Sequence, residues 1–150
     1  GAEEAFVAGL LHDIGKLILS HYVANSYEEI RQRVAEENVP FMVAEQAVLG
    51  FDHARVGGLV AEKWNLPEGL VEAICLHHEP RRAERNPPLV AFTHAGDALA
   101  LMLGAGLGTD GLMYPLDGEA IAGAGLGEKT LEEALTELGE CLIDESAFLA

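Results

Sequence analysis

The run Leu11-His12-Asp13-Ile14-Gly15-Lys16 decides how this chain is interpreted. Its neighbouring histidine and aspartate offer an imidazole nitrogen and a carboxylate oxygen from adjacent backbone positions. Divalent transition metals accept this mixed set of ligands. A second pair, His77-His78, and a later carboxylate, Asp97, follow downstream. Together these residues predict a buried metal centre, or a polar core that retains the shell of one.

The size and composition of the chain fit a single helical domain. Its 150 residues can bury a core, 49% of them are apolar and only 6% are aromatic, which suits helices packed through alanine, leucine and valine. The apolar residues recur at helical spacing, and no stretch shows the period of two that is typical of a strand. We therefore expect an all-α bundle of roughly six to eight helices.

The composition of the sequence changes after Gly104, where glycines become frequent. We expect residues 1–104 to form a helical core, and residues 105–150 to supply glycine-rich loops and C-terminal helices that pack on it. The first helix is predicted for residues 3–22. Because the chain enters it at once, we expect the core to be the C-terminal part of a domain in a longer protein.

The charge of the chain limits its partners. A formal net charge of −16 argues against binding to nucleic acid or to an anionic membrane surface. No apolar run reaches the ~18 residues of a membrane-spanning helix, and no signal-peptide pattern is found. Cys75 and Cys141 are expected to be reduced thiols. The sequence therefore predicts a cytoplasmic protein.

Residues near the histidines predict how the local backbone places them. Asp52 is expected to cap a helix that begins at His53. Gly15 lies inside an apolar helical pattern, where glycine is unfavourable, and is expected to mark a bend or a close helix contact beside the site. Two adjacent histidines point about 100° apart on a helix, so His77 and His78 can reach one centre only at a helix end.

These signals combine in four segments. They are Gly9-Leu10-Leu11-His12-Asp13-Ile14-Gly15-Lys16, Leu49-Gly50-Phe51-Asp52-His53-Ala54-Arg55-Val56-Gly57, Lys63-Trp64-Asn65-Leu66-Pro67 and Ala73-Ile74-Cys75-Leu76-His77-His78-Glu79-Pro80. The combination resembles the HDOD domain, the HD-related output domain of bacterial signalling proteins within the HD phosphohydrolase superfamily. The resemblance covers about residues 4–101 and implies an HD-like helical bundle.

The resemblance also implies a set of metal ligands. His12, Asp13 and Asp97 match positions that hold one metal in catalytic HD enzymes. His53, His77 and His78 match histidines that two-metal members add. The cofactor would be one or two ions of iron, manganese or zinc. In a catalytic protein Asp13 and Lys16 would act at the phosphate, since a metal pair generates the nucleophile and clamps the phosphoryl group.

Two departures from the pattern oppose catalysis. The first ligand histidine of the superfamily would lie upstream of Gly1, so we expect an incomplete centre in this chain alone. The GYP loop expected after His-His-Glu is replaced by Pro80-Arg81-Arg82-Ala83-Glu84-Arg85, which counts against cyclic-dinucleotide hydrolysis. We expect His94, one turn before Asp97 on the same helix face, to support the structure rather than to bind metal.

Three functions stay open at this point. The first is a regulatory output domain that acts through contacts with signalling proteins, as most HDOD proteins do. The second is a metal-dependent phosphohydrolase or phosphodiesterase with a phosphate-containing small molecule as substrate. The third is a scaffold that forms a homodimer through its glycine-rich tail. The polar residues could equally persist as a metal-free, hydrogen-bonded core.

Overall fold

Helices form all the regular structure in the part of the chain that the structure describes. The computed structural model describes residues 1–104 and 115–148, with side chains up to residue 141. The helices are α1 (Ala2–Leu11), α2 (Ile14–Tyr22), α3 (Ala24–Glu37), α4 (Phe41–Leu49), α5 (His53–Lys63), α6 (Glu68–Leu76), the 3-10 turn η1 (Pro80–Arg82), α7 (Pro87–Met102), α8 (Gly118–Gly123) and α9 (Glu128–Phe148). The prediction of an all-α bundle is confirmed.

The first predicted helix, over residues 3–22, is wrong in one respect, because the chain breaks it into α1 and α2. The helical hydrogen bonds of α1 end with the one from the His12 N–H to the Ala8 carbonyl. Asp13 then stands at the N-cap of α2 with φ −96° and ψ 10°. The apolar spacing runs on through this point, so periodicity alone does not reveal the break. The break turns the first motif toward the interior.

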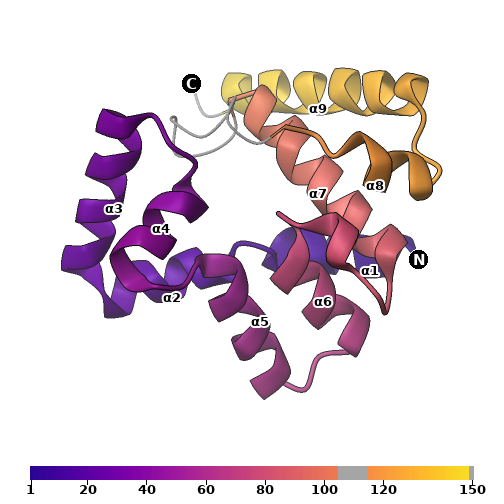
Figure 1. Ribbon diagram of the computed structural model, residues 1–150. Coiled ribbons are helices and arrows are strands. Elements are labelled where there is room, and N and C mark those ends of the chain that lie inside the picture. The colour runs from indigo at the N-terminus through magenta and orange to yellow at the C-terminus, as the bar shows by residue number, and fades with distance from the viewer. Residues whose placement is uncertain (105–114, 149–150) are drawn as a thin grey trace.

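Two apolar clusters hold the helices together (Figure 1). One joins α1, α6 and α7 through buried residues that include Ala8, Ala73 and Val90. The other joins α3 to α4 through Ile30, Val34, Phe41 and Ala44. In Figure 1 α2 lies between these two parts of the molecule, and it contacts α3 on one side and α5 on the other. The motif that begins α2 therefore lies where the two parts meet.

Gly15 makes the contact between α2 and α5 very close. A Cβ atom on this residue would lie 1.9 Å from the carbonyl oxygen of His53 and 2.9 Å from the backbone nitrogen of Gly57. Backbone atoms cannot rotate away as the end of a side chain can, so only glycine fits here. The expected close helix contact is confirmed, and it brings His53 beside the first motif.

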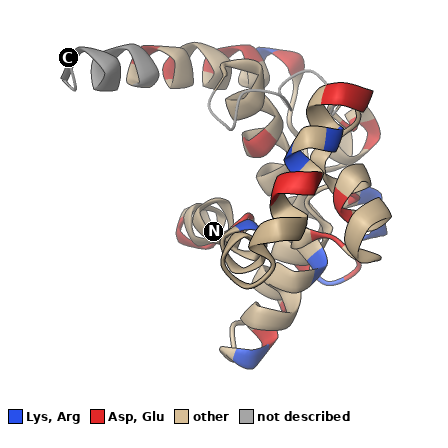
Figure 2. Ribbon diagram, turned by 90° about the vertical axis from the view of Figure 1, so that its left-hand side faces the viewer, with Lys and Arg blue, Asp and Glu red and all other residues tan. Residues whose placement is uncertain are grey.

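The C-terminal helices pack on α7. Helices α8 and α9 both contact α7, and α8 also contacts η1. The division at residue 104 stays a prediction, and most of the glycine-rich tail proposed as a dimer face, residues 105–114, lies outside the described residues. Figure 2 shows acidic positions along many helices and fewer basic ones, in keeping with the net charge of −16. No described helix is long and apolar enough to cross a membrane.

Candidate metal centre

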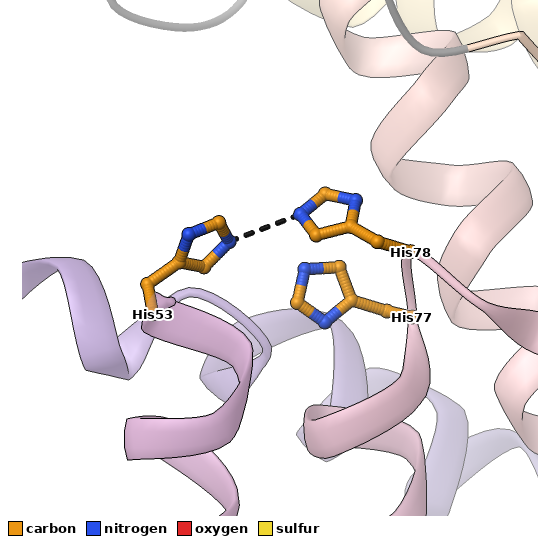
Figure 3. Close-up of side chains that lie close together, drawn as sticks. All are labelled: His53, His77 and His78. Carbon is orange, nitrogen blue, oxygen red and sulfur yellow. Dashed lines mark hydrogen bonds between the residues drawn. The ribbon is translucent and has the colours of Figure 1, made fainter. Parts of the chain in front are cut away.

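The predicted ligands come from four places in the fold. His12 and Asp13 occupy the break between α1 and α2, and His77 and His78 directly follow α6. His53 is the first residue of α5, fixed by the Asp52 carboxylate, which accepts a hydrogen bond from the Arg55 N–H. The confirmed Asp52 cap and the end of α6 thus bring three histidines together, with His53 pointing toward His77 and His78, as Figure 3 shows. The sixth residue of this His/Asp cluster, Asp97, lies on α7.

The structure brings all six of these side chains together. Two groups of three could each hold a metal ion, with ligand atoms within 4.8 Å of one another: His53, His77 and His78 in one, and His12, Asp13 and His77 in the other. Asp97 completes the ring, with its carboxylate oxygens 3.4 Å from His12 Nε2 and 3.9 Å from His78 Nδ1. His77 belongs to both groups, so the arrangement suits one ion or a pair that shares a ligand region.

In three of the histidines, the ring nitrogen that faces away from the cluster makes a hydrogen bond. This bond orients the other ring nitrogen for metal binding. The Nδ1–H of His12 donates to the Gly9 carbonyl at 2.7 Å, and that of His77 donates to the Ile74 carbonyl at 2.8 Å. The Nδ1–H of His53 donates to a carboxylate at 2.5 Å. Such bonds fix the tautomer and leave Nε2 with a lone pair directed at the cluster.

Several atoms at the centre of the cluster are buried without hydrogen bonds. Among the described residues, His12 Nε2, Asp13 Oδ1 and His77 Nε2 have no hydrogen-bond partner. They belong to one of the two groups that could hold an ion. Buried polar atoms are nearly always satisfied, because leaving one unpaired costs about 1–3 kcal/mol. Converging unpaired nitrogen and oxygen atoms therefore fit a divalent transition metal.

Asp13 links the cluster to Lys16. One carboxylate oxygen, Oδ2, accepts a hydrogen bond from Lys16 Nζ at 2.9 Å. The other, Oδ1, lies 3.3 Å from His53 Nε2 and 3.9 Å from His77 Nε2. Oδ1 would thus be the oxygen of Asp13 that holds a metal, while Oδ2 keeps the Lys16 ammonium group in place. Lys16 lies at the edge of the cluster, where the resemblance places a phosphate.

The electrostatics keep the central histidines neutral and the carboxylates charged. Burial, strengthened by repulsion from His53 and His12, lowers the pKa of His77 to about 3, and burial with the same kind of repulsion holds the pKa of His78 well below its usual range. Burial would raise the pKa of Asp13, but the Lys16 ammonium and nearby imidazoles lower it to about 2. Neutral imidazoles and ionised carboxylates are the forms that bind metal.

Two supporting residues complete the site, and one of them was not predicted. Glu45 on α4 is fully buried, and its Oε2 accepts hydrogen bonds from both the backbone N–H and the Nδ1–H of His53. The signal for it in the sequence is a single carboxylate in a helix that is apolar apart from Gln46, eight residues before His53. His94, as expected, supports the structure: its Nδ1–H donates to the His77 carbonyl, and its Nε2 accepts from the Asp117 N–H.

The donor set of the cluster can do metal chemistry. His53, His77 and His78 would hold one ion, and His12 and Asp13, with the neighbouring Asp97 carboxylate, would hold a second. When bound, such ions supply Lewis-acid catalysis or a fixed positive charge for a phosphate. The role of each residue as a ligand stays a prediction, but burial, orientation and donor type all fit it.

Comparison with known proteins gives the class of the chain. The family model of the HDOD domain matches residues 1–80, which include five of the six cluster residues. The chain therefore belongs to the HDOD domain family.

Individual relatives resemble the chain in sequence or in fold. An uncharacterised protein of Treponema pallidum (strain Nichols) is 29% identical over 89 residues, which are 59% of this chain and 17% of that protein. An HDOD domain protein of unknown function from Geobacter sulfurreducens has the same fold, with a TM-score of 0.76 at 23% identity. A "Putative phosphohydrolase" from Shewanella amazonensis SB2B has a TM-score of 0.70 at 26% identity.

Each match to a solved structure covers most of this chain but half of the solved protein. They cover 93% and 91% of this chain, but 50% of each solved chain. The chain thus spans half the length of these two structural relatives. The fold and the family are common to the matched parts, and what the longer proteins do is a separate question.

Proposed function

We propose that this chain is a regulatory output domain of a bacterial signalling protein, and that its His/Asp cluster binds one or two divalent metal ions. The domain passes on its state through contacts with other signalling proteins. Membership of the HDOD family supports the regulatory role, and the unpaired atoms of His12, Asp13 and His77 support the metal.

Regulation is favoured over catalysis by the contacts that the segment after His77-His78-Glu79 makes. In this segment Arg81 makes two ion pairs, from its Nε to Asp117 at 2.7 Å and from its NH1 to Glu119 at 2.8 Å. Both partners belong to α8 or its cap. The position where HD-GYP enzymes carry their catalytic loop therefore joins η1 to α8 in this chain.

A second candidate is a metal-dependent phosphohydrolase or phosphodiesterase. It is favoured by the placement of Lys16 and Asp13 on the wall of a cavity of about 820 Å³ beside the cluster. The printed description of the Shewanella relative points the same way. In this function Asp13 would hold metal and Lys16 would orient the phosphoryl group.

An assay of phosphodiester hydrolysis separates the two candidates. The protein is loaded with Mn²⁺ or Fe²⁺, its metal content is measured, and bis(p-nitrophenyl) phosphate is offered as substrate. The regulatory function predicts metal-loaded protein with no turnover above that of Asp13→Asn. Turnover that requires the metal and disappears in Asp13→Asn, with helix content unchanged by circular dichroism, would contradict the proposal and establish the second candidate.

A further inference from the structure

The buried side chain of His94, on α7, connects the turn that carries His77 and His78 to the start of α8. Its Nδ1–H donates to the His77 carbonyl at 2.8 Å, and its Nε2 accepts from the Asp117 N–H at 3.0 Å. A carbonyl only accepts and a backbone N–H only donates, so the two partners fix which ring nitrogen carries the proton. One imidazole ring therefore holds together two backbone segments that are far apart in the sequence.

Asp117, at the start of α8, is held in three ways. Its N–H binds His94, its Oδ1 accepts from the Ala120 N–H at 3.2 Å and so caps α8, and its Oδ2 pairs with Arg81 at 2.7 Å. The same arginine also pairs with Glu119 at 2.8 Å. The position of α8 is thus fixed from two sides, by His94 on α7 and by Arg81 on η1.

The start of α8 also lies beside the metal centre. It closes one side of a hollow of about 430 Å³, which is lined by His78, Arg81, His94 and residues 115–119. Helix α8 packs on α7 and η1, with Ile121 buried. In Figure 1 the chain leads from α8 into α9, which also contacts α7. A movement of the turn after α6 would therefore reach α8 through direct contacts.

A metal ion would act on this turn through His77. Among the described residues, His77 Nε2 is buried with no hydrogen-bond partner, and it belongs to both groups that could hold an ion. The carbonyl of the same residue accepts the hydrogen bond from His94. An ion held by His77 and His78 would restrict the turn, and this restriction would extend to His94 and Asp117. Binding of metal and packing of α8 would then depend on each other.

We propose that His94 is a positioning residue that couples the metal centre to α8, so that metal bound by His77 and His78 tightens the packing of α8 on η1 and α7. The inference rests on the proposed function. It names α8, and α9 that follows it, as the part of the domain whose packing depends on the metal. Such coupling is reciprocal, so a change that loosens α8 weakens metal binding by the same factor.

The first test is hydrogen exchange of the α8 amides, followed by mass spectrometry in metal-free protein and at saturating Mn²⁺. The amides of α3, which belongs to the other apolar core, report any general stabilisation by the metal. Relative to α3, Mn²⁺ should slow exchange in residues 118–123 by about fivefold or more. In His94→Gln, loaded with the same amount of Mn²⁺, the slowing should fall below about twofold.

The second test uses two arginine variants to examine reciprocity. Arg81 and Arg82 lie on the same turn and are 65% and 66% exposed, but Arg82 pairs with Glu79 rather than with α8. Each change to glutamine removes one positive charge, which by itself would favour cation binding. Arg81→Gln should nevertheless weaken Mn²⁺ binding about two- to fivefold in a calorimetric titration. Arg82→Gln is the matched control and should not weaken it.

The outcomes separate the coupling from the metal centre. Binding of Mn²⁺ without slower exchange in α8 relative to α3 would overturn the coupling and leave the metal centre intact. Equal slowing in His94→Gln, or equal effects of the two arginine variants, would do the same. Protein that takes up no Mn²⁺ would contradict the proposed function, and the coupling with it. If His94→Gln does not fold, the exposed Arg81 and Arg82 positions still decide the matter.

Discussion

At the scale of single residues, the cluster depends on histidines that stay neutral while buried. His77 is fully buried, its Nδ1–H donates to the Ile74 carbonyl, and its pKa lies near 3. The unfolded chain would protonate the same residue near its ordinary value of 6.5. Between these two values the unfolded state binds a proton that the folded state does not. Acid therefore favours unfolding through this residue.

We predict a loss of stability in metal-free protein as the pH falls from 6 to 4.5. The contribution of His77 to the free energy of unfolding should decrease by about 2 kcal/mol over this range, since one pKa unit corresponds to about 1.4 kcal/mol. Burial opposes protonation of His12, but its contacts with Asp97 and Asp13 outweigh burial and raise its pKa, so its contribution to the pH dependence has the opposite sign. Urea denaturation at each pH measures the change.

Variants test whether His77 causes this pH dependence. His77→Gln should show a flatter dependence than the unchanged protein, whereas His21→Gln, at an exposed position of α2, should not. Equal slopes in the unchanged protein and in His77→Gln would show that the buried imidazole is not held neutral, and would contradict the electrostatic account.

Glu45 gives a second test at this scale. Its carboxylate orients His53 through two hydrogen bonds to one oxygen, and removal of such a partner of a ligating histidine typically weakens metal binding 10–100-fold. We predict a loss of about this size in Mn²⁺ affinity for Glu45→Gln, measured by calorimetry. Glu36→Gln, an exposed change on α3, is the control. An affinity unchanged in both variants would place His53 outside the metal site.

These residues also show what sequence can and cannot predict about a site. All six residues of the cluster were predicted, five of them from local signals, namely vicinal pairs and a lone carboxylate on an apolar helix. His53 carries no such signal and was added by the resemblance to the HDOD domain. Glu45 was missed, since its role depends on the packing of α4 against the start of α5.

At the scale of elements, the junction of α2 with α5 fixes the geometry of the cluster. Gly15 lets the backbones of these helices touch at His53. The sequence predicted a close contact or a bend at Gly15, and the close contact occurs. The chain also breaks at Asp13, two residues earlier, inside the single helix that was predicted. The position of the break was not predicted, because the apolar pattern continues across it and tertiary contacts, rather than periodicity, decide where α1 ends.

We predict opposite effects for two glycine-to-alanine changes. Gly15→Ala should lower the free energy of unfolding by more than about 2 kcal/mol, because its Cβ would collide with backbone atoms of α5. Gly9→Ala, inside α1 with no atom within 4 Å of the new Cβ, should raise stability by about 0.5–1 kcal/mol. Thermal or urea denaturation measures both. Similar effects of the two changes would contradict the close packing of α2 on α5.

At the scale of the whole molecule, two apolar cores flank one polar junction. The α1–α6–α7 core and the α3–α4 core lie on either side of it, and the cluster and its cavity lie where the parts meet. A ligand or metal at this junction contacts several helices at once, so its binding can alter how they pack together. Such a difference in contacts is what lets a ligand shift a conformational equilibrium, which the proposed regulatory function would use.

The most direct test of the account is the metal content of the protein, purified without chelator and without a nickel column. Elemental analysis should find one or two equivalents of iron, manganese or zinc. The metal should be absent from Asp13→Asn with helix content preserved, and retained in the control Glu36→Gln. Protein that contains no metal, and takes up none when Mn²⁺, Fe²⁺ and Zn²⁺ are supplied, would contradict the metal centre and leave the cluster as a structural polar core.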